Sequence, residues 1–287
     1  MLISIIIPVY KDFERLEKCI KSIDDQGLDK RLFEVVVVNN DVDEDLPPLR
    51  KHELSLKVLN CQKEGSYAAR NKGAKIANGD YIAFIDSDCI PDDTWLATVK
   101  SIIENNPEAD LIAGNVILYP MRDTQPNPYE AYDMILGIDQ SSYAKKKKSV
   151  TANLVVRKSS FVQLQGFDES RFTGGDHEFC DRARELGYKF LYAPDSVVYH
   201  PARSSMSQIV GKAERRIGGR VGNTSLKNIK QILITLLPPF VRFNKVIKAN
   251  QFSWKEKKEV IKLLFIVKKY QIKELYKLLM SNKKSVR

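Results

Sequence analysis

The chain has 287 residues, enough for one large domain or for one domain with an appendage. Charged residues make up 29% and hydrophobic residues 43%, an ordinary globular balance that excludes a disordered or fibrous protein. The net charge of +10 is concentrated at one end, because residues 226–287 hold 16 Lys and Arg against 3 Asp and Glu. This basic segment predicts a polyanionic partner, either a membrane surface or a nucleic acid.

The first 120 residues alternate short apolar runs with segments of helical period. The apolar runs predict buried strands at Ile3–Val9, Glu34–Val38, Leu56–Leu59 and Tyr81–Ile85. The segments between them predict helices at Asp12–Ile23, Tyr67–Ala77 and Asp93–Glu104. This alternation indicates right-handed βαβ units, hence an α/β fold with ligands at the carboxyl ends of the strands.

The pattern changes after Leu118. Pro- and Tyr-rich sequence and a lysine run make Pro120–Lys148 a predicted loop or insertion beside the site. The elements predicted beyond it are a strand at Ser149–Arg157, a helix at Asp176–Leu186 and short strands at Lys189–Tyr192 and Val197–His200. From Ser204 onward the period is helical. We therefore expect a catalytic domain over residues 1–220 and a basic helical extension over residues 221–287.

Cysteine spacing and apolar runs bear on the compartment. The cysteines fall singly, at Cys19, Cys61, Cys89 and Cys180, which matches neither a zinc site nor a disulfide framework and favours a reducing cytosol. No basic segment precedes the first apolar strand, so no signal peptide is expected. The longest apolar run, Ile232–Val241, contains Pro238 and Pro239 and is too short to span a bilayer.

Two carboxylates one residue apart end the fourth predicted strand, in Phe84-Ile85-Asp86-Ser87-Asp88. Residues two apart in a strand project to the same side, and the turn at a strand end lets both converge on one hard cation. Such a cation would bridge to a nucleotide diphosphate. The alternative is a solvated turn before a helix, since Pro91-Asp92-Asp93 resembles a helix start.

Several motifs follow one another in a family-like order. They are Ile7-Pro8-Val9-Tyr10, Ala69-Arg70-Asn71-x-Gly73, Asn78-Gly79-Asp80, the Asp86-Ser87-Asp88 pair, Gly166-Phe167-Asp168, and Gly175-Asp176-His177-Glu178 with Arg182. In order and spacing they resemble glycosyltransferase family 2 of the GT-A fold, over about residues 1–200. The resemblance implies a Rossmann-like, mostly parallel sheet flanked by helices. The C-terminal helical extension has no such match.

The resemblance also implies roles for individual residues. Pro8, Val9, Tyr10, Asn39, Arg70 and Asp86 would bind the nucleotide-sugar donor. Asp88 resembles the direct metal ligand and His200 the histidine that completes the metal site in some members, with Mn²⁺ or Mg²⁺ as the ion. A lone histidine is also often structural.

Asp176 matches the family's catalytic base. Inverting transfer needs one carboxylate near the acceptor hydroxyl to take its proton. Asp176 could equally cap the helix that follows it, and the two roles can coexist. Glu178 is the alternative base if the register differs, and Asn153 is a further candidate for a base or acceptor contact.

The donor and its phosphates are less sharply defined. Where the family has an acidic residue that accepts the uracil N–H, this sequence has Asn39 and Asn40, so UDP is only modestly favoured over GDP or dTDP. Arg203, Arg215 and Arg216 could contact the donor phosphates or a phosphorylated acceptor. Their alternative reading is an exposed charged face.

The basic extension pairs apolar residues at helical spacing with lysines. The apolar residues are Val260, Ile261, Leu264, Phe265, Val267, Ile272, Leu275, Leu278 and Leu279. This pattern is typical of a basic amphipathic helix on an anionic membrane, and equally of helices packed on the body with a solvated lysine face. Nucleic acid is the less favoured partner, because aromatic interleaving and zinc spacing are missing.

Together these features predict a metal-dependent, inverting glycosyltransferase. It would move a sugar from a nucleotide-diphosphate donor to a glycan or lipid-linked acceptor, in cell-surface polysaccharide or glycolipid synthesis. We expect it in the cytoplasm, peripheral on the inner face of the membrane. The alternatives are a catalytically inactive sugar-nucleotide or glycan-binding protein and a sugar nucleotidyltransferase, although the latter should carry a Gly-rich phosphate loop after the first strand.

Overall fold

The computed structural model describes residues 1–121, 125–221 and 232–280. The chain forms two compact units. The sheet unit comprises Met1–Ile117, Asp139–Arg171 and Gly175–His200, and the helical unit comprises Leu118–Ile138, Phe172–Gly174 and Pro201–Arg287. This grouping differs from the boundary expected at residue 220, which stays a prediction about where the catalytic part ends.

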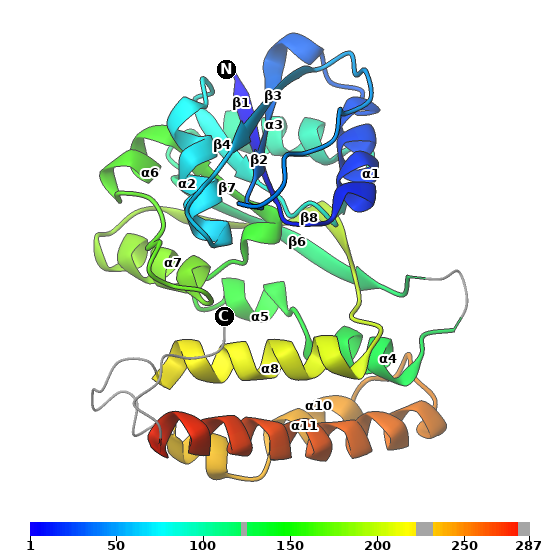
Figure 1. Cartoon of the computed structure of the whole chain (residues 1–287). Coiled ribbons are helices and arrows are strands. Elements are labelled where there is room, and N and C mark those ends of the chain that lie inside the picture. Colours follow the sequence, from blue (N-terminus) through cyan, green and yellow to red (C-terminus); the bar gives the residue numbers. More distant parts are fainter. Residues whose placement is uncertain (122–124, 222–231, 281–287) are drawn as a thin grey trace. The chain divides into compact units, whose positions relative to one another are not determined.

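An eight-stranded sheet runs in the order β3-β2-β1-β4-β7-β6-β8-β5 (Figure 1). Its strands are β1 (Ile3–Val9), β2 (Phe33–Asn39), β3 (Ser55–Asn60), β4 (Tyr81–Phe84), β5 (Ile90–Pro91), β6 (Leu111–Tyr119), β7 (Leu154–Arg157) and β8 (Phe190–Pro201). Strands β1 to β4 pair in parallel, whereas β7 pairs antiparallel with β4 and β6, and β8 with β5. The expected α/β fold is confirmed, with the parallel pairing in its N-terminal half.

The sheet unit also contains helices. They are α1 (Phe13–Asp24), α2 (Ser66–Ile76), α3 (Trp95–Asn105), α5 (Gln140–Ala144), α6 (Lys158–Gln163) and α7 (Gly175–Glu185), with short 3₁₀ turns at Lys30–Leu32 and Thr151–Asn153. Of these helices, α1, α2 and α6 contact the strands of the sheet. Strands β1 and β2 are buried along their whole length, which explains their near-continuous Ile and Val content. The predicted elements up to residue 105 agree with the observed ones to within two residues at their ends.

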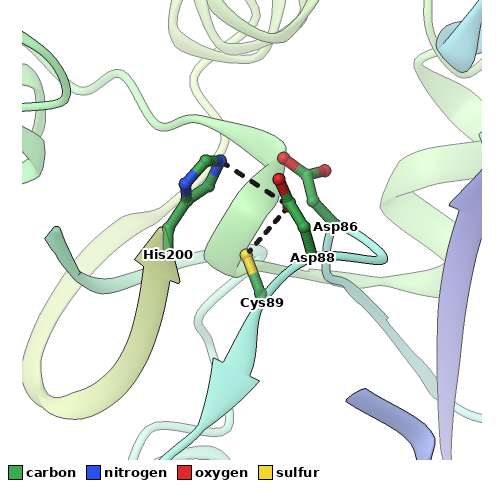
Figure 2. A group of neighbouring side chains, drawn as sticks. All are labelled: Asp86, Asp88, Cys89 and His200. Atoms are coloured by element: carbon green, nitrogen blue, oxygen red, sulfur yellow. Dashed lines mark hydrogen bonds and ion pairs between the residues drawn. The ribbon is translucent and has the colours of Figure 1, made fainter. Parts of the chain in front are cut away.

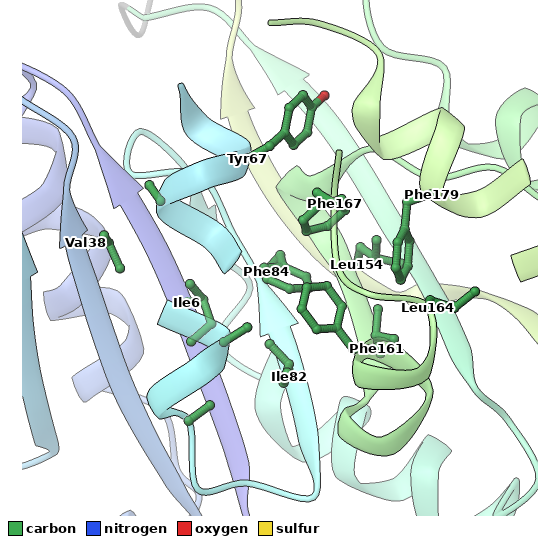
Figure 3. Close-up of a cluster of buried hydrophobic side chains, with 14 of the residues drawn as sticks. Ile6, Val38, Tyr67, Ile82, Phe84, Leu154, Phe161, Leu164, Phe167 and Phe179 are labelled. Carbon is green, nitrogen blue, oxygen red and sulfur yellow. The ribbon is translucent and has the colours of Figure 1, made fainter. Parts of the chain in front are cut away.

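An aromatic cluster joins β4 to the segments that follow β7 (Figure 3). The ring of Phe167 lies 5.1 Å from that of Phe84 and 4.9 Å from that of Phe179, centroid to centroid. Phe161 completes the cluster, 5.4 Å from Phe84. Large rings in tilted and edge-on contact bury much apolar surface in defined orientations, so β4 and α7 are fixed relative to one another.

Two predictions about the middle of the chain are wrong. Pro120–Lys148 is not simply a loop, because it holds α4 (Pro128–Leu136) and α5. Asn127 and Glu130 form a capping box at the start of α4, and its apolar residues are buried, which stabilises a short helix that looked like loop sequence. The two short strands expected after residue 188 are one strand, β8.

The helical unit has its own apolar core. Helix α4 packs there with α8 (Met206–Val221), α10 (Phe240–Ile247) and α11 (Trp254–Met280). The core residues are Ala131, Tyr132, Ile135, Leu136, Ile209, Ala213, Val246, Phe252, Val260, Leu263, Leu264 and Val267. The apolar stripe of α11 is divided, because Val260, Leu264, Val267 and Leu275 are buried whereas Phe265, Ile272 and Leu279 are exposed. The buried members agree with the packed-helix alternative. No described helix is long and apolar enough to cross a membrane.

One buried carboxylate ties the parallel strands together. Glu34 on β2 accepts hydrogen bonds from Ser4 Oγ on β1 at 2.7 Å, Lys57 Nζ on β3 at 2.7 Å and the Asn78 amide before β4 at 2.6 Å. Burial alone would raise the pKa of Glu34, but the hydrogen bonds from Lys57, Asn78 and Ser4 outweigh it and lower the pKa to about 2.

Glu34→Gln should lower the free energy of unfolding near neutral pH, by about 1–3 kcal/mol, because the buried donors lose a charged acceptor. A lowered folded-state pKa gives stability that is present above the unfolded-state value and lost as the pH falls through the folded-state value. The gap between wild type and variant should therefore shrink between about pH 4.5 and pH 2. Urea unfolding over this pH range measures it, with the half-exposed Glu104→Gln as control. A constant gap would attribute the loss to packing.

Candidate functional site

The predicted metal-binding residues come together at the end of β4 (Figure 2). Ligand atoms of Asp86, Asp88, Cys89 and His200 all lie within 4.8 Å of one another. His200 lies near the end of β8, and its Nε2 is 3.7 Å from Oδ1 of Asp88. The structure thus brings Asp86, Asp88 and His200 together. Metal ligation by Asp88 and His200, and donor contact by Asp86, stay predictions.

The electrostatics of this cluster fit a hard divalent cation. Burial raises the pKa of the Asp88 carboxyl, the imidazole of His200 opposes this, and the nearby carboxylate of Asp86 adds to it. A cation between the carboxylates would relieve that repulsion. Sequence reasoning missed Cys89, whose burial raises its thiol pKa well above the usual value. Carboxylate oxygens and imidazole suit Mn²⁺ or Mg²⁺ better than a soft thiolate does, so the carboxylates and the imidazole are the candidate ligands.

Helix α2 places the positively charged side chain of Arg70 beside this cluster. Arg70 is buried, and its guanidinium donates to the Asp86 carboxylate. The same guanidinium lies over the ring of Tyr67, 5.8 Å from its centroid. The predicted donor-contacting residues Arg70 and Asp86 are therefore neighbours, and a fixed guanidinium suits a diphosphate group.

Asp176 is oriented by Tyr67, which lies on the same face of α2 as Arg70. Its Oδ1 accepts a hydrogen bond from the Tyr67 hydroxyl at 3.2 Å and from the His177 amide at 2.9 Å. Burial raises the pKa of Tyr67, as does the nearby Asp176 carboxylate, so its hydroxyl remains a donor. A Cβ at Gly175 would lie 2.7 Å from the Tyr67 ring, so only glycine permits this approach. Tyr67 was missed, although its position three residues before Arg70 puts both on one helical face.

The two alternatives to Asp176 have structural partners. Glu178 pairs with Arg182, whose Nε lies 2.6 Å from the Glu178 carboxylate. Arg182 also donates to the backbone oxygens of Leu164 and Gly166. The side chain of Asn153 is fully buried and accepts from Trp95 Nε1 at 3.1 Å, while its amide donates to two backbone oxygens. These contacts favour structural roles for Glu178 and Asn153.

The residues predicted to bind the nucleoside lie at the ends of β1 and β2. Pro8 and Val9 are buried, whereas Tyr10 is 61% exposed. Asn39 is buried, and its amide donates to the Glu44 oxygen at 2.7 Å. Because β1 and β2 are adjacent and parallel, these positions share the edge of the sheet where Arg70 and Asp86 lie.

The three arginines predicted to contact phosphate belong to the helical unit. Arg203 donates to Asp133 Oδ2 at 2.9 Å, and Lys212 donates to the other oxygen of this buried carboxylate at 3.2 Å. Arg215 and Arg216 lie in α8. Arg203 is thus engaged in an internal ion pair, and phosphate contact by these arginines stays a prediction.

The sheet topology with a carboxylate pair at a strand end defines a GT-A-type glycosyltransferase. The family model for Glycosyl transferase family 2 matches residues 4–163, more than half of the chain. Glycosyltransferase AglE of Haloferax volcanii is 32% identical over 207 residues, which cover 70% of this chain and 67% of that protein. The chain belongs to glycosyltransferase family 2.

Other relatives and solved structures agree with this assignment. Glucosyl-dolichyl phosphate glucuronosyltransferase of Haloferax volcanii is 26% identical over 217 residues, covering 70% of this chain and 69% of that protein. TarS of S. aureus, in complex with UDP-GlcNAc, superposes with a TM-score of 0.55 at 16% identity, covering 98% of this chain and 91% of that one. Mannosyltransferase PcManGT from Pyrobaculum calidifontis, in complex with GDP-Man and Mn²⁺, gives 0.57 at 16% identity, covering 98% and 88%. These likenesses establish the fold.

Asp88→Ala should weaken divalent-dependent donor binding by about tenfold or more, because the cluster loses one of its two carboxylates. Calorimetry with a nucleoside diphosphate, in Mn²⁺ and in EDTA, measures this. Asp93→Ala is the matched control, since Asp93 is exposed and follows the motif by a few residues. Unchanged affinity in the Asp88 variant would remove Asp88 as a metal ligand.

Proposed function

We propose that this protein transfers a sugar, with inversion and with Mn²⁺ or Mg²⁺, from a nucleotide-diphosphate donor to a glycan or lipid-linked acceptor. The observation that carries the proposal is the pair of contacts made by one face of α2. Arg70 contacts Asp86 of the donor-side cluster, and Tyr67 contacts the candidate base Asp176. One helix therefore carries the partners of both the proposed donor-side residue and the proposed base.

In this mechanism Asp176 is the general base. Its carboxylate takes the proton of the acceptor hydroxyl as that oxygen attacks the anomeric carbon, opposite the departing diphosphate. The hydrogen bonds from Tyr67 and the His177 amide orient Oδ1, which leaves the second oxygen for the acceptor.

On the donor side, Arg70 places a fixed positive charge where the diphosphate leaves, and Asp86 contacts the ribose or the sugar. Asp88 and His200 would hold the divalent ion, which stabilises the charge that develops on the leaving diphosphate. Both residues are more than three-quarters buried, which strengthens these interactions by excluding water.

The donor base and the acceptor are finer proposals. UDP is favoured by Asn39 at the end of β2, because its Oδ1 accepts from the Asp41 amide at 3.0 Å and has a second lone pair for a uracil N–H. The structural neighbours bind either UDP-GlcNAc or GDP-Man. A lipid-linked acceptor is supported by the relative whose name gives a glucosyl-dolichyl phosphate substrate. This would place the reaction in glycan or glycolipid synthesis on the cytoplasmic face of a membrane.

A screen of nucleotide sugars for slow donor hydrolysis, in Mn²⁺, Mg²⁺ and EDTA, tests the proposed activity. We expect one donor class to be hydrolysed only when the divalent ion is present. If no nucleotide sugar is hydrolysed, and none binds by calorimetry, the catalytic proposal fails and the inactive binding protein replaces it.

Asp176→Asn keeps the size of the side chain but cannot accept a proton. We expect turnover with an acceptor to fall on the order of 10²-fold or more, while donor affinity stays nearly unchanged. Steady-state kinetics and donor calorimetry separate the two effects. Glu178→Gln is the matched comparison on the same helix, and it should retain most of the turnover. The reverse result would make Glu178 the base and shift the assignment by two residues.

A further inference from the structure

Exposed apolar side chains of the helical unit occur on α11, for example Trp254 and Tyr276, and are most concentrated in residues 233–241. Six large apolar residues within residues 233–241 are about half exposed or more: Leu233 at 57%, Ile234 at 47%, Leu236 at 53%, Leu237 at 61%, Phe240 at 69% and Val241 at 85%. Thr235, a polar residue among them, is buried, with only 5% of its surface exposed. On the surface of a soluble protein, polar side chains are usually exposed and large apolar ones buried. Residues 233–241, which we call the apolar segment, therefore resemble a binding surface.

The shape of the apolar segment is set by its own backbone and by α11. Residues 232–236 form a helical turn, Pro238 and Pro239 follow, and Phe240 opens α10. Lys268 Nζ on α11 donates to the Ile234 oxygen at 3.4 Å, so the turn lies against that helix. The segment is therefore a short turn fixed against α11. It is too short to span a bilayer and is suited to shallow insertion.

The charges around the apolar segment select its partner. Within residues 232–280, every exposed charged side chain is a lysine, whereas the acidic residues there are buried or half-buried. The exposed lysines are Lys245, Lys248, Lys255, Lys258, Lys262, Lys269, Lys273 and Lys277. A second copy of the chain would bring these lysines face to face. An anionic lipid surface instead attracts the lysines while it accepts the apolar side chains.

We propose that the apolar segment inserts into the surface of an acidic membrane, with the lysines of α10 and α11 bound to the lipid headgroups. The proposal rests on the proposed function, because docking on a membrane would bring the enzyme to a lipid-linked acceptor. It also narrows the insertion site to residues 233–241, within the basic segment 226–287 for which the sequence predicted a membrane partner.

Vesicle sedimentation of the full chain tests the docking surface. The wild type should bind phosphatidylcholine vesicles that contain phosphatidylglycerol, bind pure phosphatidylcholine much more weakly, and lose binding as salt increases. Leu237→Ser/Val241→Ser should lower the partition coefficient by about tenfold or more, because two exposed apolar side chains are lost. The matched control is Val162→Ser/Leu186→Ser, which removes a valine and a leucine of comparable exposure, 64% and 68%, from the sheet unit.

The charge contribution is tested separately. Lys258→Gln/Lys269→Gln/Lys273→Gln should lower binding to acidic vesicles by roughly 100-fold, at about 1 kcal/mol per lysine, without changing binding to neutral vesicles. Loss of binding in the Val162/Leu186 control, or no loss in the Leu237/Val241 variant, would overturn the assignment to the apolar segment. So would a dimer, detected by light scattering, that the Leu237/Val241 variant abolishes while vesicle binding persists.

Donor hydrolysis measured without vesicles separates this proposal from the catalytic one. All surface variants should hydrolyse donor like the wild type, since none of them touches the donor-side residues. Hydrolysis without vesicle binding rejects the docking surface alone. Vesicle binding without any donor hydrolysis or binding rejects the catalytic function and leaves the docking surface in place.

Discussion

The close approach of α2 to the first two parallel strands is the constraint on which the site depends. A Cβ at Gly73 would lie 2.6 Å from a methyl group of Ile6 and 3.0 Å from one of Val38, so the helix reaches this depth only with glycine there. At that depth Tyr67 and Arg70 reach Asp176 and Asp86. Any outward shift of α2 would separate both contacts together, because one helix carries them.

The same helix explains why the family's motifs occur together. Asn71 accepts from the Phe167 amide at 2.9 Å and donates to the Phe167 oxygen at 2.8 Å, which fixes the Gly166-Phe167-Asp168 segment. Phe167 then packs on Phe84 just before the carboxylate pair and on Phe179 just after Asp176. The motifs are distant in sequence but contact one another in the fold. Some of their residues serve the chemistry, and others hold those residues at a fixed spacing.

Much of the fold and some of the site could be predicted from sequence because local rules were sufficient there. Buried parallel strands must be apolar along their length, which made β1 and β2 recognisable, and strand ends gather ligand-binding residues. The structure brings Asp86, Asp88 and His200 together as expected. The failures had two causes. Helix α4 begins with a local capping box of Asn127 and Glu130 that was overlooked, and its apolar residues are buried by distant parts of the chain. The contact between Tyr67 and Asp176 joins residues far apart in sequence, so only the structure reveals it.

The C-terminal region shows how one pattern can support two different surfaces. Apolar residues at helical spacing between lysines predict an amphipathic helix, but not which surface covers the apolar side. In α11 that side is the core of the helical unit, where Val260, Leu264 and Val267 are buried. Other apolar residues of α11, such as Phe265 and Leu279, are exposed, and the exposure is most concentrated at residues 233–241. From the sequence, that run was interpreted only as too short to span a bilayer. Exposed apolar side chains thus occur on α11 as well, but six of those in the helical unit fall within the nine residues 233–241. Because the lysines are spread along α10 and α11 while this run is concentrated, lipid charge would govern attraction over a distance and residues 233–241 would govern depth of insertion.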